Sequence, residues 1–260
     1  METTPLTPEP ASAAPPPASS LAGRLTNVFA APGEVFAGIK DAPASVVNWL
    51  VPVLIFAGVG VISMCIMFAQ PAIQQTIHDQ QVKAMDKLVE QGKMNQAQED
   101  QALQAMEKFM GPATLAIIGS VSIVFYSFVS LFGWALVLWL AGRWWLKTPF
   151  GYLKAVEVAG LSCLITVLGM VISTLLAVIL GRLYAGPSLG LFVGNFDPAN
   201  RAHLLLGAVN LVNLWHAGVL AVGLAKLSGA PTAKAATAVF GFWVLLELLL
   251  IGIGLGQWAL

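Results

Sequence analysis

The chain has 260 residues, of which 57% are hydrophobic and only 10% are charged. Because a soluble domain carries about 25% charged residues, this composition excludes an ordinary water-soluble protein and predicts one that hides apolar surface in lipid. The formal net charge is zero, so no strong field attracts nucleic acid, and we expect no nucleic-acid partner.

The N-terminal segment differs from the rest of the chain. Residues 1–20 are mostly Pro, Ala, Ser and Thr and lack the basic and apolar regions of a signal peptide, so we expect a disordered tail. In residues 21–40 apolar side chains recur at near-helical spacing on both sides of Pro32, which predicts two short helices. These helices could lie on the membrane surface or cap a helix bundle, and the sequence leaves both placements open.

Five apolar runs are long enough to cross a hydrocarbon core of about 30 Å. We expect spans at about 47–69, 112–141, 155–180, 203–225 and 235–256. The segment 70–111 is instead rich in Gln, Lys, Asp and Glu with two helical apolar stripes, which predicts two water-side helices joined by a turn. Asn95 and Gln98 have the spacing of a capping box at the second of these helices.

The predicted fold class is therefore all-α. We expect residues 21–260 to form one polytopic membrane helix bundle, with five transmembrane helices and a helical extracytoplasmic loop. Cys65 and Cys163 both fall in apolar runs, which argues against a disulfide framework or a cysteine metal site. We expect no metal and no other cofactor.

Basic residues indicate which side of the membrane the loops occupy. Arg143, Lys147 and Lys154 mark the loop between the second and third runs, and Lys226 and Lys234 mark the loop between the last two. Because two spans precede the first of these loops and four precede the second, both loops lie on the side of the N-terminus, which the positive-inside rule places in the cytoplasm. Glu157 follows Lys154 by three residues, and this spacing favours an ion pair at the membrane interface.

Four polar side chains lie inside the last two apolar runs. They are Asn210, Asn213 and His216 in the fourth run and Glu247 in the fifth. If the two runs form an antiparallel hairpin, His216 and Glu247 lie at the same depth, about 15–18 Å from the shared turn. A hydrogen bond between them is therefore geometrically available.

Polar groups inside a membrane are candidates for function, and three interpretations remain open here. In the first, the groups satisfy one another and fix the register of the helices; in the second, they line a transport or proton pathway; in the third, they belong to an intramembrane enzyme. A transporter usually shows broken helices and inverted repeats, and the sequence shows neither. No HExxH motif, phosphate-binding loop or dinucleotide fingerprint is present, and we expect a protein that is not an enzyme.

Small residues at four-residue spacing predict close helix packing in lipid. The fourth run carries Ala217, Ala221 and Ala225, and the end of the fifth carries Gly252 and Gly256. These seams can pack the two runs against each other inside one chain, or they can mediate self-association.

Three segments of the sequence resemble the Yip family, five-pass membrane proteins named for their interaction with Rab-type (Ypt) GTPases. The first segment is VFAAPGEVF at 28–36, with Pro32 and Phe36. The second is FGYLKAVEVAGLS at 150–162, where Gly151 and Tyr152 match the family's Gly-Tyr pair. The third is LWHAGVLAVGLAKLSGAPTAKA at 214–235, with Trp215, Gly223 and Lys234. The chain looks most like the bacterial branch of this family, and the likeness extends over roughly residues 21–256.

This resemblance implies a non-enzymatic scaffold or adaptor in membrane organisation, which acts through protein partners in or next to the bilayer. It also implies the inner (cytoplasmic) membrane of a bacterium as the location. The alternative function is a small transporter or channel subunit that uses Asn210, Asn213, His216 and Glu247.

Overall fold

The structure, a computed structural model, describes residues 20–109 and 111–256. The predicted tail lies almost wholly outside these residues. The described chain is helical, and its elements in order are α1 (Leu21–Ala30), α2 (Pro32–Lys40), α3 (Val47–Phe68), α4 (Pro71–Glu90), α5 (Gln96–Phe109), α6 (Pro112–Leu140), the π-helical η1 (Ala141–Trp145), α7 (Tyr152–Leu180), the 3₁₀ helix η2 (Leu189–Phe192), α8 (Arg201–Ala208), α9 (Leu211–Ser228) and α10 (Thr232–Gly252).

Five of the described helices are long and apolar enough to cross a membrane, which confirms the predicted fold class. They are Val47–Phe68, Pro112–Trp145, Tyr152–Leu180, Leu211–Ser228 and Thr232–Gly252. The fourth differs from the prediction of one span over 203–225. The helical conformation is interrupted between α8 and α9. Asn210 is extended at this point, and its side chain caps the first turn of α9. The expectation of unbroken helices was therefore wrong.

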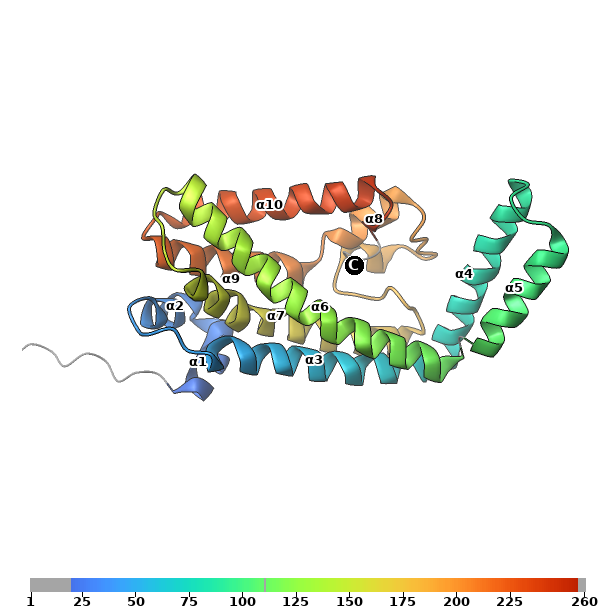
Figure 1. Cartoon of the computed structure of the whole chain (residues 1–260), viewed down its shortest axis with the longest axis horizontal. Coiled ribbons are helices and arrows are strands. Elements are labelled where there is room, and N and C mark those ends of the chain that lie inside the picture. The colour runs from blue at the N-terminus through green and yellow to red at the C-terminus, as the bar shows by residue number, and fades with distance from the viewer. Residues whose placement is uncertain (1–19, 110, 257–260) are drawn as a thin grey trace, which may run out of the picture.

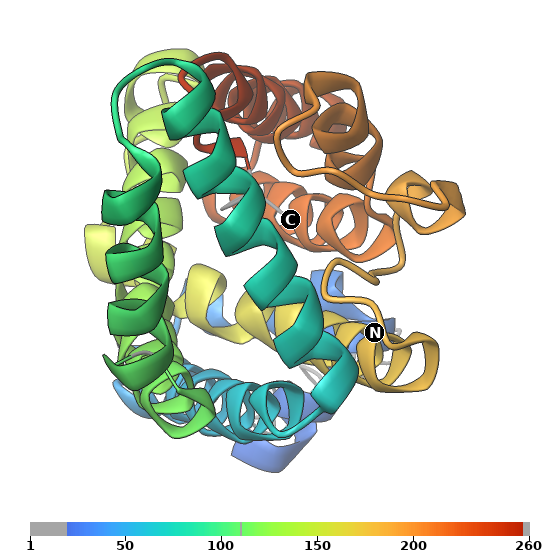
Figure 2. The same ribbon diagram turned by 90° about the vertical axis from the view of Figure 1, so that its right-hand side faces the viewer.

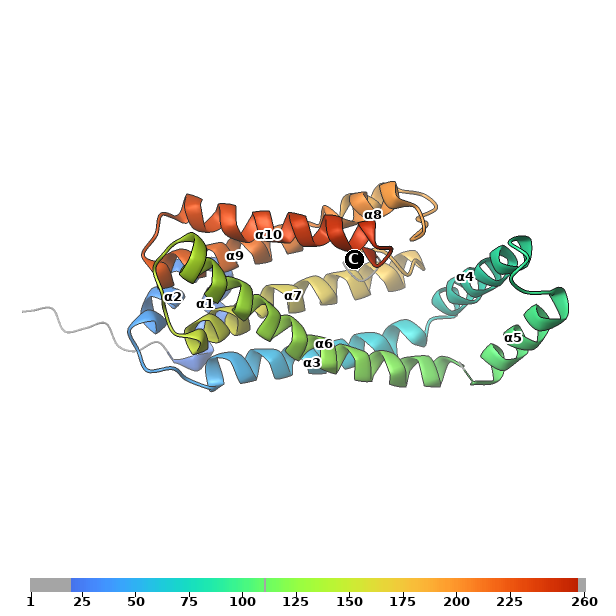
Figure 3. The same cartoon turned by 45° about the horizontal axis from the view of Figure 1, so that its top comes forward.

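Helix α7 is the central element of the bundle. It packs against α3, α6 and α9, and α9 in turn pairs with α10 (Figure 3). One end of the bundle holds α1, α2 and the α9–α10 turn, and we call it the cap end. The opposite end holds the α4–α5 pair and α8, and we call it the hairpin end (Figure 1).

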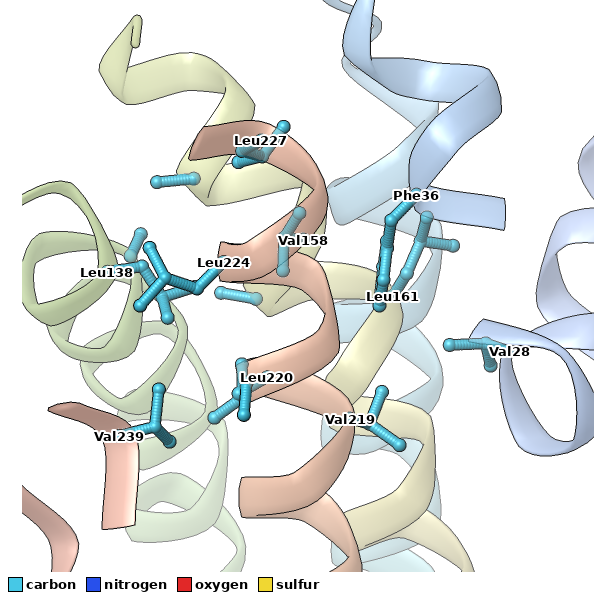
Figure 4. Packing of buried hydrophobic residues seen from close by; sticks show 14 of the residues in the cluster. Val28, Phe36, Leu138, Val158, Leu161, Val219, Leu220, Leu224, Leu227 and Val239 are labelled. Atoms are coloured by element: carbon cyan, nitrogen blue, oxygen red, sulfur yellow. The ribbon is translucent and has the colours of Figure 1, made fainter. Parts of the chain in front are cut away.

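The main apolar core lies in the cap half of the bundle. Figure 4 shows side chains of α2, α7 and α9 meeting there, with Phe36 and Leu161 both fully buried. Val28 of α1 and Ile39 of α2 belong to the same cluster. The two N-terminal helices are therefore a cap packed on the bundle, and the alternative of helices resting on the lipid surface alone does not describe them.

Helices α4 and α5 extend beyond the hairpin end of the bundle. Figure 2 looks onto this end, with α4 and α5 in front and the connector that contains η2 and α8 in orange beside them. The predicted capping box is present, because the Asn95 side chain accepts from the Gln98 amide at 2.8 Å and the Gln98 side chain accepts from the Asn95 amide at 3.0 Å. Ile73, near the start of α4, is buried against the end of α7 and the connector.

Candidate functional site

Among the described residues, no hydrogen bond joins the side chains of the four polar residues predicted inside the membrane to one another. Asn210 lies before the first turn of α9, where its Oδ1 accepts from the amides of Val212 at 2.9 Å and Asn213 at 3.4 Å. An N-cap of this kind satisfies helix amides that have no partner within the helix. Asn210 is therefore the N-cap residue at which α9 begins, on the side of the hairpin end.

His216 and Glu247 each have aromatic neighbours. The His216 ring packs edge-on against Trp134 of α6 with centroids 5.8 Å apart, and Trp134 packs in the same way against Phe242 of α10 at 5.9 Å. Glu247 lies one turn after Trp243, within reach of its indole N–H. Within the part of the chain that the structure describes, no hydrogen bond joins His216 to Glu247. Trp134, which the sequence analysis did not single out, instead links α6, α9 and α10.

A buried polar network at the cap end was only partly predicted. The expected ion pair is present, with 2.9 Å between Lys154 Nζ and Glu157 Oε2. Glu157 is only 1% exposed, and its Oε1 also accepts from the Asn48 side chain at 2.6 Å and from the Ser45 amide at 3.0 Å. Lys154 Nζ donates in addition to the carbonyl of Ile39 at 2.6 Å.

This network ties three elements together. Lys154 and Glu157 come from the first turns of α7, Asn48 from the start of α3, and Ile39 from α2. A buried charge is tolerated when it is paired and its remaining lone pairs accept hydrogen bonds, and Glu157 meets both conditions. A signal for Asn48 was available in the sequence, because it is an amide at the start of an otherwise apolar run.

Two glycines allow the helices of the cap end to approach closely. A Cβ added to Gly223 of α9 would overlap Val158 of α7 and would lie 3.3 Å from the ring of Phe36. A Cβ added to Gly160 of α7 would overlap the backbone Cα of Trp49 in α3. Glycine at these two positions therefore sets the spacing between α7 and its neighbours on both sides.

The residues that carry the family resemblance are mostly structural here. Phe36 and Gly223 meet in the core, and Pro32 begins α2. Gly151 precedes the first turn of α7, and the Tyr152 hydroxyl donates to the Phe132 carbonyl at 3.3 Å. Trp215 packs edge-on against Phe29 of α1 at 6.0 Å, whereas Lys234 is exposed in the first turn of α10.

The predicted small-residue seam of α9 faces the interior of the chain. Ala217, Ala221 and Ala225 are all buried. Because these residues are covered by the chain's own helices, the seam serves internal packing and is not available for self-association. Gly252 has open space around it, whereas Gly256 lies against Leu204 and Ile251.

Comparison with known protein families gives a match over most of the chain. The family model described as the Yip1 domain matches residues 26–254, a range that contains α2 through α10 and every residue on which the resemblance rests. No curated protein and no solved structure gave a significant match.

Proposed function

The chain belongs to the Yip1 domain family, and we propose that it is a non-enzymatic scaffold or adaptor that presents its cap end to a protein partner. The observation that carries this proposal is the construction of the cap. Phe36 is fully buried, and Lys154 holds the last turn of α2 through the Ile39 carbonyl. Gly223 lets α9 approach Val158 of α7 and the Phe36 ring closely. A surface that is organised before binding costs less to order when a partner arrives.

The outer side of the cap is available to such a partner. Along α1 and α2, side chains that alternate with the buried ones are exposed, among them Asn27, Ala30, Glu34 and Ala37. We propose a protein partner in or next to the membrane, with the cap as its contact surface and the bilayer as the second contact of the chain.

Charge supports a cytoplasmic position for the cap. The basic residues of the cap end and of the neighbouring segment from η1 to the first turns of α7 are Arg24, Lys40, Arg143, Lys147, Lys154, Lys226 and Lys234. The acidic residues of the same region are Glu34, Asp41 and Glu157. The α4–α5 pair and the connector after α7 carry basic and acidic residues in nearly equal numbers. Positive loops remain in the cytoplasm, so we propose an N-in orientation, in the inner membrane if the host is a bacterium.

We expect topology reporters to agree with this orientation. A reporter inserted in the loop at 146–150 should act as cytoplasmic, and one inserted at Gly92, in the turn between α4 and α5, should act as extracytoplasmic. Gly92 has open space around it and a positive φ of 67°, so an insertion there disturbs little packing. A cytoplasmic signal from position 92 would contradict the N-in orientation.

The scaffold function is tested by site-specific photocrosslinking in the native membrane. A crosslinker at Ala37 of the cap should join the chain to a discrete protein, whereas one at Gln101 of α5 should not, although both positions are exposed. Phe36→Ala should abolish the adduct at position 37 by loosening α2, since deleting a buried phenyl ring costs about 3–5 kcal/mol. Phe125→Ala, at a residue that is 71% exposed on α6, is the matched control and should leave the adduct unchanged.

The transporter alternative has one observation in its favour, the break between α8 and α9. Transporters use such breaks at their substrate sites. If no adduct forms at position 37, and the purified protein in liposomes carries a solute flux that His216→Ala or Glu247→Gln abolishes, the scaffold proposal is wrong and the transporter is favoured.

A further inference from the structure

A small cavity lies where the fourth span is interrupted. Its volume is about 130 Å³, which is room for several water molecules. The end of α7 contributes Ser173, the connector contributes Tyr184, Gly186, Ser188 and Phe196, and the residue before α9 contributes Asn210. None of the residues that line it carries a charge.

The backbone around the break is already satisfied. The Leu211 amide donates to the Pro187 carbonyl at 3.0 Å, and the Leu189 amide donates to the Val209 carbonyl at 3.1 Å. The next two amides of α9 donate to Asn210 Oδ1. Because the first backbone amides of α9 are used in this way, the helix N-terminus offers no free backbone donor to an anion, and no cationic side chain lines this cavity.

The hydrogen bonds of Asn210 use only one end of its side chain. Asn210 is 7% exposed, and within the described residues its side-chain hydrogen bonds engage Oδ1 and leave the Nδ2 group to face the cavity. The Nδ2 group lies next to Gly186 and Ser173. A Cβ added to Gly186 would be 3.7 Å from Asn210 Nδ2 and 3.3 Å from Ser173 Oγ. An amide donor and a hydroxyl therefore flank one small empty volume.

The lengths of α7 and α9 place the cavity near the expected boundary of the hydrocarbon core. Helix α7 is about 43 Å long, and Ser173 is about 31 Å from its cap end, which is close to the thickness of the hydrocarbon core. Helix α9 is about 27 Å long, so Asn210 lies at the same level on the other side of the cavity. A ligand can therefore reach the site from water or from the lipid headgroup region at the hairpin end.

The chemistry of the lining restricts the class of ligand. Ser173 and Ser188 can each donate and accept, and Asn210 Nδ2 donates. Burial raises the pKa of Tyr184, so its hydroxyl stays protonated at neutral pH, and it donates to Gln80 at 3.4 Å. The Tyr184 and Phe196 rings lie 5.4 Å apart and supply an apolar wall for C–H groups. An apolar ligand would leave Asn210 unpaired, and a charged one would find no counter-ion.

We propose that this cavity binds a small uncharged polyol, whose hydroxyls pair with Asn210 and Ser173 and whose carbon skeleton lies against Tyr184 and Phe196. The polyol can be a free solute, or it can be the terminal glycerol of a phosphatidylglycerol headgroup. The inference stands independently of the proposed scaffold function, because it concerns the opposite end of the bundle.

The test is saturation-transfer NMR of glycerol with the full chain in phosphatidylcholine nanodiscs. We expect saturable binding to the wild type, at least tenfold weaker binding to Gly186→Ala, and binding roughly three- to tenfold weaker to Ser173→Ala, which loses one hydrogen bond. Gly194→Ala is the matched control, because this glycine of the same connector has open space around it, and it should bind as the wild type does.

A second experiment, in nanodiscs that contain phosphatidylglycerol, distinguishes the two sources of the polyol. If adding phosphatidylglycerol to the nanodiscs displaces glycerol, the headgroup is the occupant, and if it does not, the ligand is a free solute. Both results support the site. Absence of saturable glycerol binding to the wild type, or equal binding to Gly186→Ala in protein that elutes as a folded particle, would mean that water alone fills the cavity and would overturn the proposal.

Discussion

Gly160→Val should destabilise the membrane domain by about 3 kcal/mol, the upper end of the usual cost of overpacking. The reason is that a Cβ at this position would meet the Trp49 backbone, with Asn48 O at 3.2 Å as a further contact. Backbone atoms cannot change rotamer to make room, so α3 and α7 must move apart. Residues 155–165 of α7 are buried without interruption, and the separation would open the centre of the core.

The measurement is the free energy of unfolding of the purified protein in detergent, obtained from a thermal or denaturant titration. Gly58→Val is the matched control, because Gly58 lies in α3, is exposed, and has no neighbour within 4 Å of an added Cβ. Its effect should stay within about 0.5 kcal/mol. Equal stability of the two variants would show that the close contact between α3 and α7 does not hold the domain together.

The spans could be predicted from the sequence because their signal is local. A run such as 47–69 needs only composition and length to be recognised, since water-free lipid requires the backbone bonds to close within the helix. The capping box of Asn95 and Gln98 is equally local, because both of its hydrogen bonds join residues three apart.

The interruption of the helix before α9 could not be predicted from the local sequence. Residues 203–225 are apolar enough to span a membrane as one helix, yet α8 ends at Ala208, and Asn210 is extended and caps the first turn of a new helix, α9. The connector stabilises this interruption of the helix. Its Pro187 carbonyl accepts from the Leu211 amide, and its Leu189 amide donates to the Val209 carbonyl, on either side of Asn210. These partners are about twenty residues away in sequence, so the pattern of one run does not contain them.

The candidate site shows the same division. The pairing of Lys154 with Glu157 follows from their spacing in one helix and was predicted, whereas their partners Asn48 and Ile39 lie more than 100 residues away in sequence. The predicted approach of His216 to Glu247 depended on depth alone. Depth fixes position along the helix axis but not rotation about it, and in the structure the ring of Trp134 packs against His216.

Lys154→Met should destabilise the domain by about 3–5 kcal/mol, the cost of leaving one partner of a buried ion pair alone. Glu157 is 1% exposed and would keep its hydrogen bonds from Asn48 and the Ser45 amide but lose its counter-charge. The double variant Lys154→Met/Glu157→Gln should recover more than half of the loss, because the Gln carbonyl can accept the same two hydrogen bonds without a charge. Lys234→Met, at an exposed lysine of α10, is the control and should change the free energy of unfolding by less than about 0.5 kcal/mol. If the double variant is no more stable than Lys154→Met alone, the buried charge of Glu157 is not what makes the lysine necessary, and the network acts through the Ile39 contact instead.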